Sequence, residues 1–297
     1  MLKKVIYDYI SSLELAGLGI YSGSSAIFEQ QAPDDIDSGW EGIQYGRVIY
    51  DLLIRDDADR KVSGSLRIMA AYTDVDMLPT AERKLQDAFD TTFFTDIEED
   101  LTIATTWQKT EPFNAKSGGE MDIDVFGSIL YFDVYAFPVK RYVPMDAVAS
   151  LAAYIRSRCP DVWVINDGMI KDSNPVWRPG TSLPASAVYV RLEQITPGSF
   201  PSTYACTWYT ARLWVHVISA SFDAANQILT DISYALSEAE RFPMDDGSPF
   251  FVSQTQIRQG NSTLRDGQMQ VQGQYGILRE MQDAQPMNTI NMNEGRG

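Results

Sequence analysis

The chain has 297 residues, a formal net charge of −16, and 44% hydrophobic and 22% charged residues. This is the composition of an ordinary globular protein, and it excludes a wholly disordered or collagen-like chain. Apolar runs stay below the roughly 18 residues that a membrane-spanning helix needs, and acidic Asp8 and Glu14 interrupt any signal-peptide core. We therefore expect a soluble protein, made in the cytoplasm, with two domains from its length.

The acidity is concentrated in the first half. Residues 1–144 hold 13 basic and 25 acidic residues, a net charge of −12, whereas residues 145–297 hold 11 and 15, a net charge of −4. Because phosphate binding depends on clustered Lys and Arg, a chain this acidic is a poor candidate for wrapping nucleic acid. Simple solubility and a partner that the first half repels are both open explanations.

The first half alternates between helical and strand-like patterns. Apolar spacing and runs rich in β-formers predict a helix over 2–16, strands over 42–55 and 62–74, a helix from Pro79 to about 94, and strands over 100–108 and 121–137. A loop rich in Ser, Asp, Gly and Pro joins the first helix to the first strand, and residues 111–120 read as a turn.

The second half repeats this order. The pattern predicts a helix around 148–155 that Pro160 ends, a short strand over 162–165, a long loop to about 186, strands over 187–195 and 203–219, a helix from 222 to 239 with Ser221 as its N-cap, and strands over 248–259 and 266–278. In the last run, apolar residues alternate with glutamines, which is typical of a strand with one solvated face.

Short matches accompany the repeated order. Residues 67–69 (RIM) align with 212–214 (RLW) at an offset of 145, and residues 123–127 align with 269–273 at an offset of 146. We interpret the pattern as a tandem duplication, with chance recurrence of common elements as the alternative.

The predicted fold class is α+β: two tandem two-layer units, each an antiparallel sheet with helices on one face, in the order α-β-β-α-β-β. The domains are expected at 1–143 and 144–283, followed by a flexible C-terminal tail at 284–297. The longest predicted strands exceed the usual ~5–6 residues, and such strands can pair with neighbouring subunits by strand addition.

No nucleophile, metal set or phosphate loop is recognisable. His216 is the only histidine and alternates with apolar residues on a strand, which is typical of a core or interface histidine whose hydrogen bonds are satisfied. Cys159 and Cys206 have no metal or redox spacing and are expected to be free thiols. The G-x-G at Gly17 and Gly19 follows a helix and lacks the later glycine of a dinucleotide fingerprint.

Acidic clusters lie in turn-like stretches at 34–37, 56–59 and 245–246. Solvated turns explain them best, with adventitious Ca²⁺ or Mg²⁺ binding and glycosidase-like catalysis as alternatives. We therefore predict no catalytic residue, no cofactor and no metal, and a protein that is not an enzyme.

What remains is surface suited to association. The hairpin tips at 56–65, 111–120 and 196–204 combine charge, Gly, Pro and aromatic residues, and the C-terminal tail has neither periodicity nor much charge. Six Trp and fifteen Tyr favour interfaces. The candidate interface residues are Arg60, Lys61, Lys116, Phe200, Tyr204, Met287, Asn288 and Met292.

The layout resembles the tail terminator (tail completion) proteins of long-tailed bacteriophages. The residues that carry the resemblance are the N-terminal helix, the loop with Gln31-Ala32-Pro33-Asp34-Asp35, the strands that follow, the AERKLQDAF helix and two closing strands. The second half is similar to the same domain, with SFDAANQILTDISYAL in place of the second helix. A typical family member resembles one half of this chain.

The resemblance implies a structural virion protein without catalytic residues. Its expected partners are further copies of itself in a ring (a trimer of two-domain chains, or a hexamer), the tail tube protein, the neck or head–tail connector protein and the sheath. DNA would pass through the lumen without specific binding, past an acidic lining that repels phosphate. The expected location is the virion tail or neck, and the host cytoplasm during assembly.

Three alternatives stay open. The chain is also compatible with another neck, connector or baseplate protein of a phage or phage-like injection machine. A carbohydrate-active enzyme would need two carboxylates about 5–10 Å apart in a cleft. A small-ligand binding module would need a well-formed apolar pocket.

Overall fold

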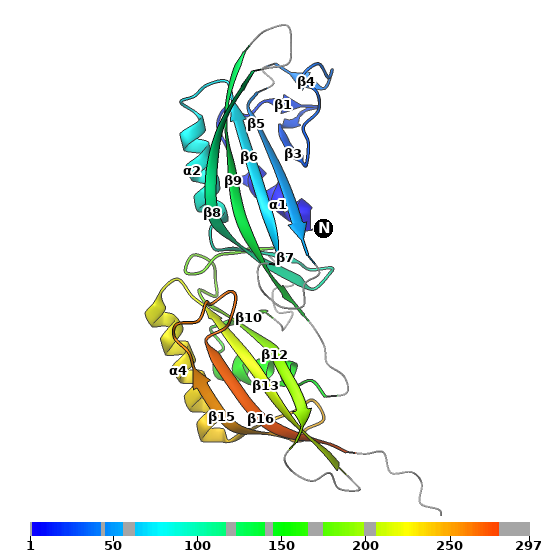
Figure 1. Ribbon diagram of the computed structural model, residues 1–297, viewed down its shortest axis with the longest axis vertical. Coiled ribbons are helices and arrows are strands. Elements are labelled where there is room, and N and C mark those ends of the chain that lie inside the picture. Colours follow the sequence, from blue (N-terminus) through cyan, green and yellow to red (C-terminus); the bar gives the residue numbers. More distant parts are fainter. Residues whose placement is uncertain are drawn as a thin grey trace, which may run out of the picture.

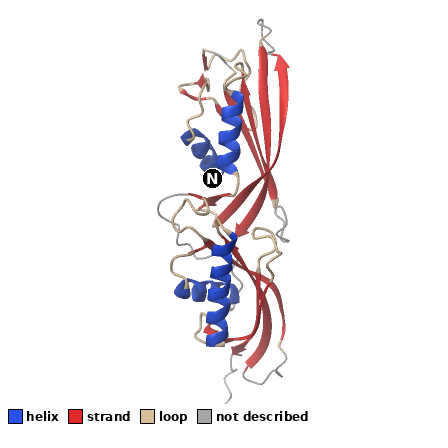
Figure 2. Ribbon diagram, turned by 90° about the vertical axis from the view of Figure 1, so that its left-hand side faces the viewer, coloured by secondary structure: helices blue, strands red, loops and turns tan. Residues whose placement is uncertain are grey.

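The protein is an α+β protein in which two units lie end to end (Figure 1). The computed structural model describes residues 2–42, 45–55, 63–116, 123–139, 145–165, 175–198 and 206–278. In both units the helices cover one face of the sheet and leave the other face without helices (Figure 2). None of the helices in these ranges has the length and apolar character to cross a membrane.

The first unit contains two helices and most of a seven-stranded sheet. Its elements are α1 (Leu2–Ser12), β1 (Ile20–Tyr21), β2 (Ser24–Ser25), β3 (Ile27–Glu29), β4 (Trp40–Glu41), β5 (Arg47–Ile54), β6 (Gly64–Tyr72), α2 (Leu78–Phe89), β7 (Thr92–Asp96), β8 (Leu101–Lys116) and β9 (Asp124–Pro138). Strands β2, β1 and β4 form a separate small sheet.

The second unit contains two helices and a six-stranded sheet. Its elements are α3 (Ala147–Arg158), β10 (Trp163–Val164), β11 (Val176–Trp177), β12 (Ala187–Pro197), β13 (Cys206–Ile218), α4 (Phe222–Ala239), β14 (Arg241–Pro243), β15 (Pro249–Ile257) and β16 (Met269–Leu278).

The two sheets have the same strand order. In the first it is β3-β5-β6-β9-β8-β7, with β11 added at the β7 edge as a seventh strand, and in the second it is β10-β12-β13-β16-β15-β14. In each sheet the first pair is parallel and every later pair is antiparallel. Equivalent strands also follow equivalent helices along the chain, so the repeated order extends to the topology of the sheet.

The expectation of purely antiparallel sheets was wrong. Short edge strands, β3 and β10, each run parallel to the first long strand of their sheet, which makes both sheets mixed. Each unit also contains a short strand directly after its second helix, β7 or β14, which the sequence pattern did not predict. Strands of two to five residues are too short to produce a readable alternation.

The strand register contradicts one of the two local sequence matches, the alignment of residues 123–127 with 269–273. Gly127 pairs with Ala71, and a Cβ there would meet the ring of Phe113 on the face away from the helices. Gly273 pairs with Ala211, and a Cβ there would meet the ring of Phe250 on the face that the helices cover. The helix-facing residues are even-numbered in β9 and odd-numbered in β16, so the even offset of 146 aligns residues of opposite orientation.

The helices form where their apolar faces predict them. Helix α4 spans the predicted residues and buries Ala225, Leu229, Ile232 and Leu236, and the Ser221 hydroxyl accepts a hydrogen bond from the Ala224 amide at 3.2 Å. Helix α1 ends at Ser12 instead of 16, because Glu14 adopts a left-handed conformation with φ 48°. Helix α2 ends at Phe89 instead of 94, and β7 begins three residues later.

The strand whose length differs most from its prediction is β8, in the β8–β9 hairpin. Strand β8 continues through Lys116, so the first six residues of the predicted turn at 111–120 are extended and pair with β9. Pairing with a long partner strand overrides the turn preference of Pro112 and Asn114. The expected alternation in β16 is confirmed, with Met269, Val271, Gly273 and Tyr275 buried and the glutamines between them partly exposed.

Candidate interaction surfaces

Most of the predicted interface residues lie outside the described residues. This holds for Arg60, Lys61, Phe200, Tyr204, Met287, Asn288 and Met292, and for the acidic stretch at 56–59. The expected tail at 284–297 and the expected domain boundary at 143–144 also lie outside them. Lys116 is described: it is exposed at the end of β8, at the tip of the β8–β9 hairpin.

An aromatic cluster joins the two units. It contains Phe93 and Phe137 from the first unit and Trp163, Trp177 and Tyr189 from the second, all buried. The ring centroid of Trp177 lies 5.0 Å from that of Phe93 and 5.3 Å from that of Trp163. Part of the aromatic surplus that pointed to interfaces is therefore used inside the chain.

Strand β11 strengthens this joint. Although it belongs to the second half of the sequence, Val176 and Trp177 pair antiparallel with Phe94 and Phe93 at the edge of the first sheet. The next residue, Arg178, donates a hydrogen bond to the Asp87 carbonyl at the end of α2, at 2.5 Å. The two units are therefore connected by a shared sheet as well as by side-chain packing.

His216 lies in the same region and has the structural role that its strand position predicted. It is 1% exposed, and its ring packs edge-on against Tyr189 and Phe137. Its Nδ1 lies 2.7 Å from the Thr263 carbonyl, and its Nε2 accepts a hydrogen bond from Nε of Arg191 at 3.1 Å. Since guanidinium groups only donate, these contacts place the ring hydrogen on Nδ1.

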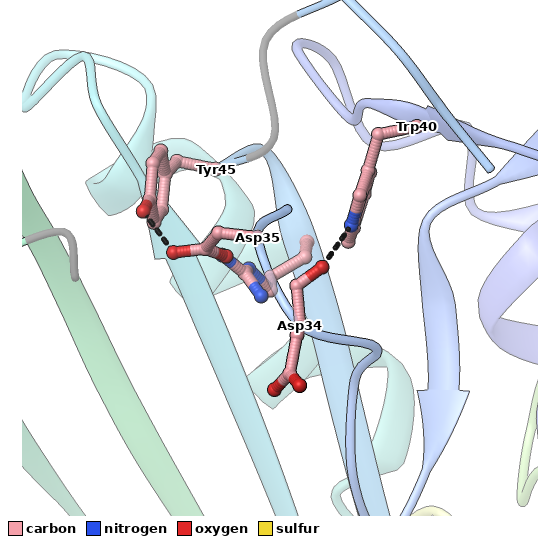
Figure 3. Close-up of polar contacts among 5 residues, drawn as sticks. Asp34, Asp35, Trp40 and Tyr45 are labelled. Atoms are coloured by element: carbon pink, nitrogen blue, oxygen red, sulfur yellow. Dashed lines mark hydrogen bonds and ion pairs between the residues drawn. The ribbon is translucent and has the colours of Figure 1, made fainter. Parts of the chain in front are cut away.

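The acidic loop before β5 is held by polar contacts among Asp34, Asp35, Trp40 and Tyr45 (Figure 3), together with Arg47. The Arg47 guanidinium pairs with the Asp35 carboxylate at 2.6 Å and stacks between two rings, 5.3 Å from the centroid of Trp40 and 4.8 Å from that of Tyr45. The Tyr45 hydroxyl donates to the same carboxylate. The expectation of a solvated turn was wrong for Asp35, because its side chain is mostly buried in this ion pair.

Further hydrogen bonds order the rest of this loop. The Trp40 indole donates to the Asp34 carbonyl at 3.0 Å, and the Asp37 carboxylate accepts from the Gly39 amide at 2.8 Å and from the Tyr21 hydroxyl at 3.1 Å. Between these anchors, Ile36 is 89% exposed. A loop held by hydrogen bonds thus presents an exposed aliphatic side chain between two aspartates, Asp35 and Asp37.

The second acidic turn, Asp245–Asp246, matches its prediction. It lies exposed between β14 and β15, and the Ser248 amide donates to the Asp246 carboxylate at 2.9 Å. Hydrogen bonds from Ser248 hold the pKa of Asp246 below its usual value. This is the local side-chain-to-backbone bonding for which aspartate is favoured in turns.

The open face of the second sheet is rich in amides. Its outward-facing residues on β15 and β16 include Gln254, Gln256, Gln270, Gln272 and Gln274. Trp214 lies between two guanidinium groups, 5.7 Å from Arg191 and 5.3 Å from Arg258. Three of these side-chain amides are already engaged, since Gln270 donates to Glu193, Gln272 accepts from Arg212 and Gln256 accepts from Arg258.

Strand β8 has an open edge that is poorly suited to strand addition. Strand β7 pairs only with Leu101–Thr105, and within the described residues the rest of β8 pairs with β9 alone. Pro112, which lacks an amide hydrogen, and two lysines, Lys109 and Lys116, lie on this stretch. Proline and lysine on an edge strand disfavour pairing with another chain.

A groove on the second unit runs between α3 and β14. Its volume is about 490 Å³, and Ser150, Ala153, Tyr154, Ser157, Arg158 and Pro243 line it. The Arg158 guanidinium lies 5.4 Å from the Tyr154 ring centroid. Among the described residues, no carboxylate forms an ion pair with Arg158.

Both cysteines are free and half-buried, as their spacing predicted. Cys159 follows the last turn of α3, and burial raises the pKa of its thiol, which makes it less nucleophilic. Cys206 begins β13.

Comparison with known proteins does not assign the chain to a family. No protein-family model matches the chain, and no curated protein matches it.

Proposed function

We propose that this chain is a structural virion protein that forms a ring at the head-proximal end of a phage tail, where it ends tail-tube polymerisation and docks to the neck. The observation that best supports the proposal is the pair of α+β units with one strand order, held end to end. A chain with two ring-forming domains supplies two positions of a ring, so three chains build a pseudo-hexamer. Six chains with one domain inside and one outside are the other arrangement.

The joint between the two units is consistent with a ring component that carries two domains. A shared strand pair and a buried aromatic cluster hold the units in one relative orientation, so each chain brings its two domains to the ring in fixed positions. In this proposal the more acidic first half lies nearer the DNA path, where like charge keeps the phosphates from adhering. The tube protein, the neck protein and the sheath are the other proposed partners.

The first test is the mass of the purified protein. Light scattering should give a species of three or six chains, and negative-stain images should show rings. A monomer at every concentration would contradict the proposal.

The second test is genetic. Tails assembled without this protein should be irregular in length and should fail to join heads, and supplying the protein in trans should restore both properties. Tails of normal, controlled length in its absence would refute terminator function, whatever the mass measurement shows.

A further inference from the structure

We propose that the ordered loop of residues 31–39 (the Ile36 loop) of one copy docks into the groove between α3 and β14 (the α3 groove) of a second copy. The inference rests on the proposed ring and names the contact that builds it. It is carried by an exposed apolar anchor, a charge on each side that forms no ion pair within the described ranges, and the shape of the groove.

The Ile36 loop has the properties of a preorganised anchor. Ile36 is 89% exposed, yet the ion pair between Asp35 and Arg47 fixes the loop before it, and the Asp37 carboxylate, which accepts hydrogen bonds from Tyr21 and Gly39, fixes the loop after it. An ordered loop loses little conformational entropy when it binds, so an aliphatic tip on it contributes more of its burial energy to affinity. Solvation alone does not explain an exposed aliphatic side chain at this position of the turn.

The charges of the two surfaces are complementary. Asp34, two residues before Ile36, is exposed, and within the described ranges no cation pairs with its carboxylate. Arg158 in the α3 groove is an exposed cation without a carboxylate partner in the same ranges, although acidic residues outnumber basic ones 40 to 24. Each surface therefore offers the charge that the other lacks.

The groove also fits the anchor sterically. Ala153, Tyr154 and Pro243 supply apolar surface, and about 490 Å³ leaves room for an aliphatic side chain. The Arg158 guanidinium, which also lines the groove, suits the aspartates of an incoming loop, and the Ser157 oxygen, whose hydrogen is donated to the Tyr154 carbonyl, can accept from a backbone amide.

The contact is heterologous, because the loop lies on the first unit and the groove on the second. Each copy then offers one loop and one groove, so the contact can be repeated from copy to copy, and it builds a ring when the rotation between copies closes. Because the loop and the groove lie on different elements, each copy can use both at the same time. This single kind of contact is therefore sufficient for a ring.

The test measures self-association of the full chain by sedimentation velocity, with five single variants of exposed residues and one double variant. Ile36→Ser should weaken association by about 30-fold, the change expected for a central interface anchor. Leu183→Ser is the matched control, because Leu183 is 93% exposed on another loop, and it should leave association unchanged. Circular dichroism of each variant checks that the fold is retained.

Charge reversal identifies the groove. Asp34→Arg and Arg158→Glu should each weaken association, and the double variant should restore it, whereas Arg212→Glu on the open sheet face should have no effect.

Unchanged association in Ile36→Ser, or no recovery in the double variant, would overturn the inference while the ring and the proposed function stand. If Ile36→Ser forms normal rings but fails to join tail tubes, the occupant is the tube protein and the inference is also overturned. A monomeric wild-type protein would overturn the proposed function together with the inference.

Discussion

Tyr50 and Tyr72 are both buried on the helix-covered face of the first sheet, but their hydroxyl groups differ in their surroundings. The Tyr50 hydroxyl donates to the Lys3 carbonyl of α1 at 3.0 Å, and so ties the helix to the sheet. The Tyr72 hydroxyl is buried without a hydrogen-bond partner among the described residues. Because an unsatisfied buried polar group destabilises the folded state, the two hydroxyls should have opposite effects on stability.

We expect Tyr72→Phe to raise the free energy of unfolding by about 1 kcal/mol and Tyr50→Phe to lower it by about 1 kcal/mol. Urea unfolding measures both, and Tyr234→Phe, at a side chain that is 70% exposed, is the control that should change little. Equal losses in the two core variants would contradict the different roles of the hydroxyls.

The same two side chains predict alkaline sensitivity. Burial raises the pKa of Tyr72 from 10.0 to about 12, and burial together with the nearby Glu29 does the same for Tyr50. Below pH 10 both phenols are neutral in the folded and the unfolded chain. Between pH 10 and about 12 only the unfolded chain ionises them readily, so stability falls as the pH rises through this window.

Absorbance at 295 nm, which follows tyrosine ionisation, should therefore show a late step that coincides with the loss of near-ultraviolet circular dichroism. Ionisation of all tyrosines by pH 11 with the fold intact would contradict this expectation.

At the scale of elements, the two helices of the second unit begin with side-chain caps. The Asp146 carboxylate accepts from the Val148 and Ala149 amides at the start of α3, at 2.9 and 3.1 Å, and Ser221 caps α4. Capping residues satisfy amide groups that have no partner within the helix.

Loss of a cap should destabilise the second unit. Asp146→Ala and Ser221→Ala should each lower the free energy of unfolding by about 1 kcal/mol. Ser237→Ala, at an exposed position in the last turn of α4, is the matched control. Since alanine has the higher helix propensity, it should have no effect or a slightly stabilising one. Thermal unfolding distinguishes these outcomes, and a control variant as unstable as Ser221→Ala would argue against the cap.

At the scale of the whole molecule, the joint between the units determines whether they unfold together. Trp177 is 3% exposed, contacts aromatic rings from both units and donates its indole hydrogen to the Pro184 carbonyl at 2.7 Å. With the joint intact, we expect a single calorimetric transition, because neither unit can open without exposing the aromatic cluster.

Trp177→Ala should remove about 3–5 kcal/mol and separate the transition into two, one for each unit. Trp107→Ala is the control, because Trp107 is 39% exposed and lies away from the joint on β8. Two transitions in the wild-type protein would show that the units are independent and would weaken the argument for fixed positions in a ring.

The sequence by itself determined the α+β class, the order of the long elements and the bounds of α4. These follow from spacing along one segment: apolar residues three and four apart make one helix face, and alternating residues make one strand face. The role of His216 could also be predicted, because its strand neighbours placed it on an apolar face.

Only the tertiary structure decided how these elements meet. Val176–Trp177 joins the first sheet across more than 80 residues of sequence, and Asp35 becomes an ion-pair partner because β5 brings Arg47 beside it. The exposed Ile36 stands out only once its neighbours are known to be fixed. Such pairings depend on which distant surfaces remain uncovered after the local elements have formed, and no local periodicity contains that information.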